Sequence, residues 1–488
     1  MRSKQQLSAA PENTKKMSRK AVANEYSAGS KATSRVASPN GSSRPSSRNP
    51  SRIPSENEDT DLDSLLDFAD DEVNNEYWEQ EFSDVVTNIV DRKRSSVQGR
   101  EEAYAAFDRL SKFHYVHDEL YGRVGELTAA FCKSLKQESS VRETTLALRA
   151  LELLALSAND NTVYENVEPV LTRTIRDSSS NLVKSSAIRC LGSCAVFAGA
   201  GEDGMLDQMN FFLDIVASYG ESISASHDTD CIEAALTEWG HLATHIWDLS
   251  AESEEAIEIF AEQLGGNDTG VQIAAGENIA LLYEKSFSPR ANFGEDEEED
   301  DEDDEAEEDK KNNQDEDEEA LLNYEGPRLV QRYEPYHDTP EILNQLKSLA
   351  TAHSKRISKK DKKSLHTNFI SIYTSVEDAR RGPMYNTAIN YNTNRHFGSK
   401  TRVKIGRDGV VAVDRWWKWI RLNKLRRLLL GGFYVHFNQG NQTVLDSLPL
   451  AVLRLDSETG TGQWKTDKGR KPQDTRRFAI HHDEDDGE

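Results

Sequence analysis

The sequence predicts an all-α solenoid of armadillo/HEAT-like helical hairpins, with a small α+β module near the C-terminus and disordered tails. Helix-length periods of apolar residues follow one another from Tyr77 to Lys285, where strand-like alternation is absent. Two of these segments resemble each other at a spacing that suits stacked hairpins. The 488 residues also separate their charge into blocks, although the formal net charge is −26. Such blocks are typical of tails and binding surfaces.

The N-terminal residues 1–58 have the composition of a disordered basic tail. They are rich in Ser, Arg, Pro and Asn, and residues 1–54 hold eleven Lys or Arg and two Glu, a net charge of +9. Such a segment buries too little apolar surface to offset its ordering entropy. An Arg/Ser-rich transit peptide is the alternative, but the segment shows no amphipathic apolar face.

The acidic stretch DLDSLLDFAD (61–70) is a candidate partner-docking helix. Its apolar residues are Leu62, Leu65, Leu66 and Phe68, and the three leucines share one helix face. Acidic flanks keep such a helix soluble until its leucines meet a groove. The simpler alternative is a solvated lead-in to the first folded helix.

Residues 59–292 form the predicted armadillo-like repeat domain. Ser, Asp, Asn and Gly separate its apolar segments. The expected helices cover residues 77–93, 98–113, 116–137, 141–157, 163–176, 181–197, 207–219, 229–248, 253–264 and 270–285. Short connections between them favour helical pairs that stack side by side.

Two helical segments of this domain resemble each other. NLVKSSAIRCLGSC and TGVQIAAGENIALL superpose with Val183 on Val271 and Ala187 on Ala275. Positions 183 and 271 are 88 residues apart, which is two steps of 44. Periods of about 40–47 residues are those of armadillo and HEAT repeats. Each hairpin is therefore expected to bury its apolar face against its neighbours.

The segment 293–320 is acidic. Residues 295–319 hold nineteen Asp or Glu and two Lys, a net charge of −17. Self-repulsion predicts a solvated, disordered loop. The alternative is that this loop occupies the basic surface encoded downstream, as an internal mimic of a nucleic acid.

Residues 321–400 are expected to continue the helices and then form a basic linker. From 328 to 437 the chain holds twenty-two Lys or Arg and eight Asp or Glu, a net charge of +14. A dense cluster comprises Lys355, Arg356, Lys359, Lys360, Lys362 and Lys363. Cations concentrated in this way are typical of surfaces that face polyanions.

Residues 401–455 are predicted to form the α+β module, and residues 456–488 a disordered tail. TRVKI-GRDG-VVAVD (401–414) has two alternating runs around a Gly-rich turn, which predicts a β-hairpin. Asp414 is a candidate N-cap for the next helix, and Gly431–Gly432 a candidate stop. FYVHF (433–437) is expected to be a further strand.

The stretch DRWWKWIRLNKLRRLLLG (414–431) combines tryptophans, leucines and cations. On a helix its apolar residues fall on two sides, which predicts burial on two sides with the Arg and Lys stems reaching outward. Asp414 is the sole acid within the stretch. The cations of this module therefore complete the predicted polyanion-facing patch: Arg402, Lys404, Arg407, Arg415, Lys418, Arg421, Lys424, Arg426 and Arg427.

Catalytic and cofactor motifs are not recognisable. His241 and His245 share a helix face without the glutamate that a metalloprotease helix needs, and GAGEDG (199–204) lacks the Lys-Ser/Thr of a P-loop. Cys190 and Cys194 lie one turn apart without further ligands nearby, so buried thiols are expected. We expect no enzyme activity, metal, cofactor or small-molecule substrate. There is no apolar run of 18 residues, so no membrane span is expected.

Three regions of the chain resemble the interferon-related developmental regulator family. The N-terminal helical domain of the family is similar to SVQGREEAYAAFDRL (96–110), YENVEPVLTRTIRDSSSNLVKSSAIRCLGSCAVF (164–197) and GENIALLYE (276–284). Its basic linker is similar to SKKDKKSLHTNFISIYTSVED (358–378), and its C-terminal domain to VKIGRDGVVAVDRWWKWIRLNKLRRLLLGGFYVHF (403–437). This chain departs from animal members in its longer Ser/Arg-rich N-tail, its long acidic run and a C-tail that ends in acids.

This resemblance implies an armadillo-like fold without enzymatic activity. Members are described as transcriptional co-regulators that contact histone-deacetylase corepressors, and as factors that bind non-translating ribosomes. Together with the basic segment, this favours a regulator of gene expression that binds the ribosome through rRNA. The alternative is a nuclear adaptor that captures corepressor or other protein complexes in the solenoid groove. The expected location is accordingly cytoplasmic, nuclear or both.

Overall fold

The computed structural model describes residues 77–92, 95–289, 329–351, 359–390, 395–399, 402–405, 409–448 and 451–452. The predicted tails, the motif at 61–70 and the acidic segment 293–320 lie outside the described residues.

The helices expected between Tyr77 and Lys285 are present. They are α3 (Trp78–Val90), α4 (Val97–Phe113), α5 (Val124–Gln137), α6 (Val141–Ala158), α7 (Thr162–Asp177), α8 (Asn181–Phe197), α9 (Gly201–Ala217), α10 (Thr229–Ala243), α11 (Ser253–Leu264) and α12 (Thr269–Lys285). Two starts differ from expectation, because α5 begins eight residues later than predicted and α9 six residues earlier.

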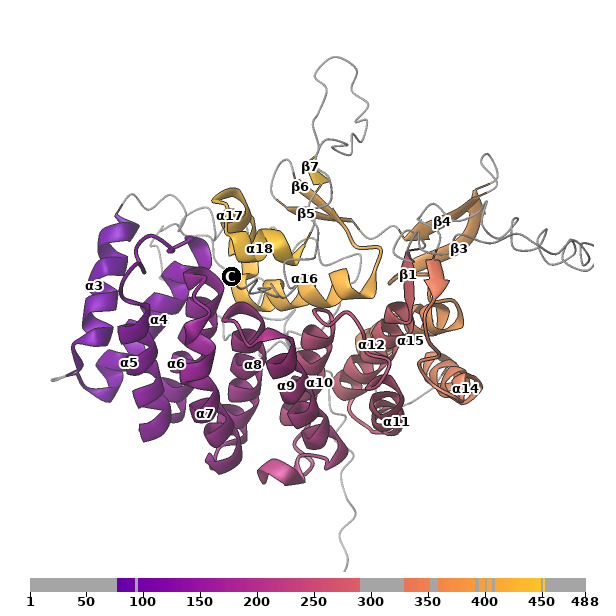
Figure 1. The fold of residues 1–488 in the computed structure, drawn as a ribbon, viewed down its shortest axis with the longest axis horizontal. Coiled ribbons are helices and arrows are strands. Elements are labelled where there is room, and N and C mark those ends of the chain that lie inside the picture. Colours follow the sequence, from indigo (N-terminus) through magenta and orange to yellow (C-terminus); the bar gives the residue numbers. More distant parts are fainter. Residues whose placement is uncertain are drawn as a thin grey trace, which may run out of the picture. The chain divides into compact units, whose positions relative to one another are not determined.

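These helices form a row of antiparallel hairpins in two layers (Figure 1). The even-numbered helices α4, α6, α8, α10 and α12 pack against one another in one layer, which we call the inner layer. Their first residues are 44, 40, 48 and 40 positions apart, so the predicted repeat length is close to the observed one. The superposed positions Val183, Ala187, Val271 and Ala275 are all buried. The armadillo-like prediction is confirmed.

A sixth hairpin extends the row beyond α12. It consists of α14 (Thr339–Thr351) and α15 (Lys359–Glu377), and α15 packs on α12. The short strands β1 (Phe287–Pro289) and β2 (Leu329–Gln331) pair antiparallel, so they bring together the two ends of the intervening segment. After α15, the strands β3 (Tyr385–Asn390) and β4 (Arg395–Ser399) form a hairpin that the sequence analysis did not anticipate.

The C-terminal module begins with the expected β-hairpin. Strand β5 (Arg402–Ile405) pairs with β6 (Gly409–Ala412), and β7 (Ala451–Val452) adds to β6. Helix α16 (Trp416–Leu429) follows and ends at the predicted glycines, through the 3₁₀ turn η4 (Leu430–Gly432).

The strand predicted at 433–437 is wrong. These residues form helix α17 (Phe433–Asn438), followed by α18 (Gln442–Ser447). The consecutive residues Val435 and His436 are both buried, which a strand with one packed face does not achieve. His436 Nε2 lies 3.0 Å from the carbonyl oxygen of Ser111 in α4, so tertiary packing decides the local structure.

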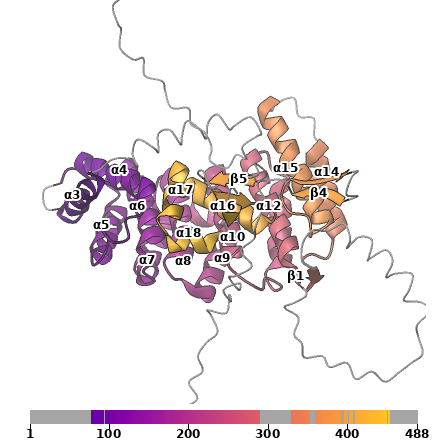
Figure 2. The ribbon, with the colours of Figure 1, turned by 90° about the horizontal axis from the view of Figure 1, so that it is seen from above.

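Helix α16 lies across the inner layer and runs from α12 toward α4 (Figures 1 and 2). Apolar residues of α16 and of the repeat helices belong to one continuous core. The C-terminal module is therefore an integral part of the helical row, whereas the sequence had suggested a separate module fused to it.

Gly432 is where the module approaches α4 most closely. A Cβ at this position would lie 1.7 Å from the carbonyl oxygen of Lys112. Gly432→Ala should therefore force two backbone segments apart and lower the free energy of unfolding by about 1–3 kcal/mol, as measured by urea denaturation. Gly125→Ala is the matched control, because a Cβ there meets nothing within 4 Å. Equal stabilities for both variants would contradict the close approach.

Candidate interaction site

Both ends of α16 are capped by side chains of the repeat helices. Glu284 of α12 accepts from the backbone N–H groups of Trp416 (2.7 Å) and Trp417 (3.2 Å). Arg149 of α6 donates to the carbonyl oxygens of Arg427 and Leu428, both at 2.6 Å. An anion at the N-terminus and a cation at the C-terminus both complement the helix dipole.

The prediction that Asp414 is the N-cap of α16 is wrong. Arg415 occupies the N-cap position without a side-chain hydrogen bond to the helix, since Glu284 already accepts from the first two N–H groups. Asp414 instead pairs with Lys418 at 2.5 Å. The cap therefore comes from another element and could not be read from the local sequence.

The tryptophans of α16 are largely structural, as expected. Trp416 and Trp419 are each only 2% exposed, and four leucines of the helix are also buried. The indole N–H of Trp419 donates to Glu277 Oε1 in α12 at 3.0 Å. Burial raises the pKa of Glu277 to about 7, against the lowering effect of this hydrogen bond. The aromatic face of α16 is thus anchored to α12.

Two cations of α16 face acids inside the protein. Lys424 is 3% exposed and forms an ion pair with Glu238 of α10, which is fully buried. Arg427 donates to Glu152 of α6 (Nη1–Oε2, 3.2 Å) and lies 3.8 Å from Glu238. Burial raises the pKa of Glu152, but Arg427, Lys424 and Arg149 outweigh it and hold this pKa well below its usual range. Burial lowers the pKa of Lys424 to about 8 despite Glu238.

Arg421 is also used within the protein. Its guanidinium donates to Thr244 at the end of α10, both to Oγ1 (2.9 Å) and to the carbonyl oxygen (2.8 Å), and to the carbonyl oxygen of Ser447 (3.3 Å). Burial lowers the pKa of Arg421 to about 10. Three of its five N–H groups therefore tie α16 to both α10 and α18.

These contacts correct the predicted outward patch. Arg421, Lys424 and Arg427 point into the interface between α16 and the inner layer, where a phosphate cannot reach them without displacing protein groups. The remaining cations of this helix, Arg415, Lys418 and Arg426, are half-buried. Arg415 donates to the carbonyl oxygen of Arg380 at 3.3 Å, and the Lys418 Nζ lies 5.5 Å from the centre of the Trp417 ring. For these three the polyanion role stays a prediction.

The cations outside α16 are placed in two groups. Lys359, Lys360, Lys362 and Lys363 form the start of α15, and Arg402 and Lys404 lie in β5. Lys355, Arg356 and Arg407 lie outside the described residues, as do Leu62, Leu65, Leu66 and Phe68. The structure thus divides the described part of the predicted patch: Arg421, Lys424 and Arg427 face the interior, whereas the other described cations lie elsewhere on α16, at the start of α15 and in β5.

The acids that bind α16 were missed by the sequence analysis. They are Glu152, Glu238, Glu277 and Glu284, which lie among mostly apolar residues of the inner helices. A carboxylate flanked by buried apolar residues needs a buried partner. Segments such as RALELLALSA and EAALTEWGHL therefore did contain a signal.

The thiol and imidazole groups noted in the sequence are buried. Cys190 and Cys194 are free, with their sulfur atoms 4.0 Å apart. Burial, followed by nearby cations, lowers the pKa values of His241 and His245 well below 6.5. Among the described residues, no group of three or more His, Cys, Asp or Glu is arranged to hold a metal ion. In the same part of the chain, no helix is long and apolar enough to span a bilayer.

The chain is similar in sequence to known proteins. A family model described as interferon-related developmental regulator (IFRD) matches residues 44–377, which is more than half of the chain. This range ends at α15, so α16 lies outside it. An uncharacterized protein of Schizosaccharomyces pombe is 22% identical over 367 residues, covering 74% of this chain and 72% of the relative. The chain belongs to the interferon-related developmental regulator family.

Proposed function

We propose that this chain is a non-enzymatic regulator of gene expression that binds RNA, on the ribosome, through the basic turn at the start of α15. Membership of a regulator family supports the regulatory role. The observation that carries the RNA-binding part is the position of Lys359, Lys360, Lys362 and Lys363 in α15.

Helices α12 and α15 run in the same direction. The end of α12 lies near the start of α16, which Glu284 contacts. The end of α15 lies near the same point, because Gly382, just after α15, lies next to Asp414. The two helices also cross where Gly276 meets Ile372.

The start of α15 extends past its neighbour. Gly276 is seven residues from the start of α12, whereas Ile372 is thirteen residues from the start of α15. At 1.5 Å per residue, α15 therefore reaches about 9 Å further (Figure 2). The four lysines belong to this projecting helix start, which supports the proposal that a phosphate backbone is bound there.

Two further cations can extend this surface. Arg402 and Lys404 are two residues apart in β5, so they lie on the same face of the strand. The β3–β4 hairpin contacts α15 and precedes β5 in the chain. Lysines and arginines spread over a helix and a strand suit a phosphate backbone better than a single small ligand.

Neutralising the basic turn is expected to weaken RNA binding and its dependence on salt. In the quadruple variant Lys359→Gln, Lys360→Gln, Lys362→Gln and Lys363→Gln, the log–log slope of affinity against salt should become shallower by about 3, because each lost phosphate contact contributes about 0.7–0.9. Fluorescence anisotropy with labelled rRNA helices and purified ribosomal subunits, between about 50 and 200 mM KCl, measures this slope.

A control variant that loses four positive charges elsewhere distinguishes the effect of local contacts from the effect of net charge. Lys133, Lys136, Arg142 and Lys347 are exposed on α5, α6 and α14. Their quadruple replacement by glutamine should leave the salt slope within about 1 of the parent value. Equal losses in both variants, or migration of the parent only in light sucrose-gradient fractions at low salt, would contradict the proposal.

The nuclear adaptor alternative relied on the solenoid groove and on the motif at 61–70, which lies outside the described residues. Helix α16 covers the inner layer at α6, α10 and α12, so a partner peptide cannot occupy that part of the groove as expected. No contact among the described residues specifically favours the adaptor. A ribosomal role is cytoplasmic, and that location is part of the present proposal.

A further inference from the structure

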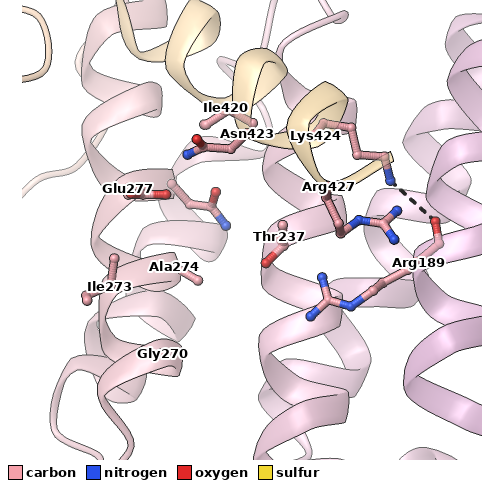
Figure 3. Close-up of a pocket in the computed structure, with 11 residues that line it drawn as sticks. Arg189, Thr237, Gly270, Ile273, Ala274, Glu277, Ile420, Asn423, Lys424 and Arg427 are labelled. Atoms are coloured by element: carbon pink, nitrogen blue, oxygen red, sulfur yellow. Dashed lines mark hydrogen bonds between the residues drawn. The ribbon is translucent and has the colours of Figure 1, made fainter. Parts of the chain in front are cut away.

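The second layer of the row, which we call the outer layer, is acidic along α9, α11 and α14. These helices contact one another in that order (Figure 1). They hold four, four and one Asp or Glu respectively, against Lys347 alone. The cations of α16 do not neutralise this layer, because Lys424 and Arg427 lie beneath α16 and face the inner helices (Figure 3). The outer layer therefore presents a net negative surface.

An exposed tryptophan borders this acidic layer. Trp247 lies on the connection between α10 and α11 and is 58% exposed. Every other tryptophan that the structure describes is buried or half-buried. Tryptophan is among the residues most enriched at the centres of protein interfaces, because its large rigid ring gains much contact area at little entropic cost. An exposed indole beside a charged surface is therefore a candidate anchor for a partner.

The ring of Trp247 already binds a cation of this chain. The central guanidinium carbon of Arg332 lies 4.8 Å from the centre of the Trp247 ring and 5.4 Å from that of Tyr333. Arg332 also donates to the carbonyl oxygens of Trp247 (3.1 Å) and Lys285 (2.8 Å), which fixes its position. An aromatic ring attracts cations at either face. Because much of the indole is still accessible to solvent, it can stack with a second guanidinium.

Carboxylates surround the aromatic residues next to Trp247. Burial raises the pKa of Tyr333 to about 12, and the nearby Asp248 and Glu252 act in the same direction. Burial also raises the pKa of Tyr336, followed by the carboxylates of Glu258, Glu341, Glu254 and Asp338. The cations here are already engaged, since Arg332 is fixed as described and His337 pairs with Glu254. We call Trp247 and these six carboxylates the acidic-aromatic surface.

We propose that the acidic-aromatic surface binds an arginine-rich segment of a partner protein. One guanidinium would stack on Trp247, and neighbouring cations of the segment would pair with the carboxylates. Complementary charge favours a basic occupant, whereas a nucleic acid is repelled. Arginine suits the surface better than lysine, because its planar group stacks on aromatic rings and pairs bidentately with carboxylates. The proposal does not depend on RNA binding, since none of these residues lies at the start of α15.

Fluorescence anisotropy with the full chain tests this proposal. The probe is a short labelled peptide that alternates arginine with Gly-Ser, and a second peptide carries lysine in place of each arginine. The parent should bind the arginine peptide saturably and the lysine peptide more weakly. Trp247→Ala should lower the affinity for the arginine peptide about fivefold. Tyr121→Ala is the matched control, because it removes an aromatic ring that is 89% exposed elsewhere, and it should bind like the parent.

A pair of triple variants tests the contribution of the carboxylates. Asp248→Asn, Glu258→Gln and Glu341→Gln together should lower the affinity for the arginine peptide about tenfold. The control combines Asp84→Asn, Glu126→Gln and Glu165→Gln, which are exposed acids of α3, α5 and α7. This control loses the same charge outside the acidic-aromatic surface, and its affinity should stay within about twofold of the parent value.

The possible results separate this proposal from its alternatives. Absence of saturable binding by the parent, or equal losses in the two triple variants, overturns the surface. Equal affinity for both peptides, or unchanged binding by Trp247→Ala, overturns the role of the indole. Self-association of the parent in sedimentation velocity that the first triple variant abolishes would identify a second copy as the occupant, against the proposal. The glutamine variant of the four lysines in α15 should bind the peptide like the parent, so failure of RNA binding is distinguishable.

Discussion

Glu238→Ala is expected to destabilise the chain by about 3–5 kcal/mol, because it leaves buried cations without their acid. Glu238 is completely buried, and its carboxylate pairs with Lys424, which is itself almost inaccessible to solvent. Arg427 lies 3.8 Å from the same carboxylate. Without this carboxylate, the Lys424 ammonium group stays buried with no acid to offset its lost hydration.

Urea denaturation followed by circular dichroism measures this loss. Asp177→Ala is the control: it breaks a solvent-exposed pair with Arg173 and should change stability by less than about 1 kcal/mol. In the double variant Glu238→Leu with Lys424→Met, much of the loss should return, because apolar residues of similar volume can replace a buried pair at little cost. A Glu238→Ala variant as stable as Asp177→Ala would show that the pair does not hold α16 in place.

Trp419→Ala is expected to cost about 3–5 kcal/mol, because it removes a large buried side chain and leaves a cavity. Trp419 packs between α16 and the inner layer and is only 2% exposed. Its loss also deprives Glu277 of the indole N–H that it accepts at 3.0 Å. The same denaturation experiment measures the change, and loss of α16 docking should appear as increased amide hydrogen exchange in α12.

Two variants separate packing from hydrogen bonding at this position. Trp419→Phe keeps an aromatic ring but removes the N–H, and should lower the free energy of unfolding by about 1–3 kcal/mol. Trp247→Ala removes a tryptophan that is 58% exposed, so a smaller effect is expected than for Trp419→Ala. If the Trp247 and Trp419 truncations cost the same, α16 does not share the core of the repeats.

The repeat helices could be predicted because their information is local. Apolar positions such as Val183 and Ala187 recur with the period of a helix, and the same pattern returns 88 residues later at Val271. The observed spacing of the inner helices follows from this repetition. The β5–β6 hairpin was also predictable, because its turn and both of its strands lie within fourteen residues, 401–414.

The environment of α16 could not be predicted, because its partners are distant in sequence. Arg427 is 275 residues from Glu152, and Trp419 is 142 residues from Glu277. Counting charges within residues 414–431 finds six Lys or Arg against Asp414 alone, and so suggests a free basic surface. In the folded chain, Lys424 and Arg427 are matched by carboxylates from the inner layer.

The pairing of β1 with β2 has a consequence for how this protein can vary between species. Phe287 lies opposite Gln331, so the chain leaves and re-enters the helical row at almost the same point. The entropy cost of closing a flexible excursion grows only with the logarithm of its length, about 0.6 kcal/mol for each doubling. Insertions or deletions between 290 and 328 are therefore expected to change the free energy of folding by about 1 kcal/mol or less. The length of that stretch can therefore change while the helical hairpins on either side keep their packing.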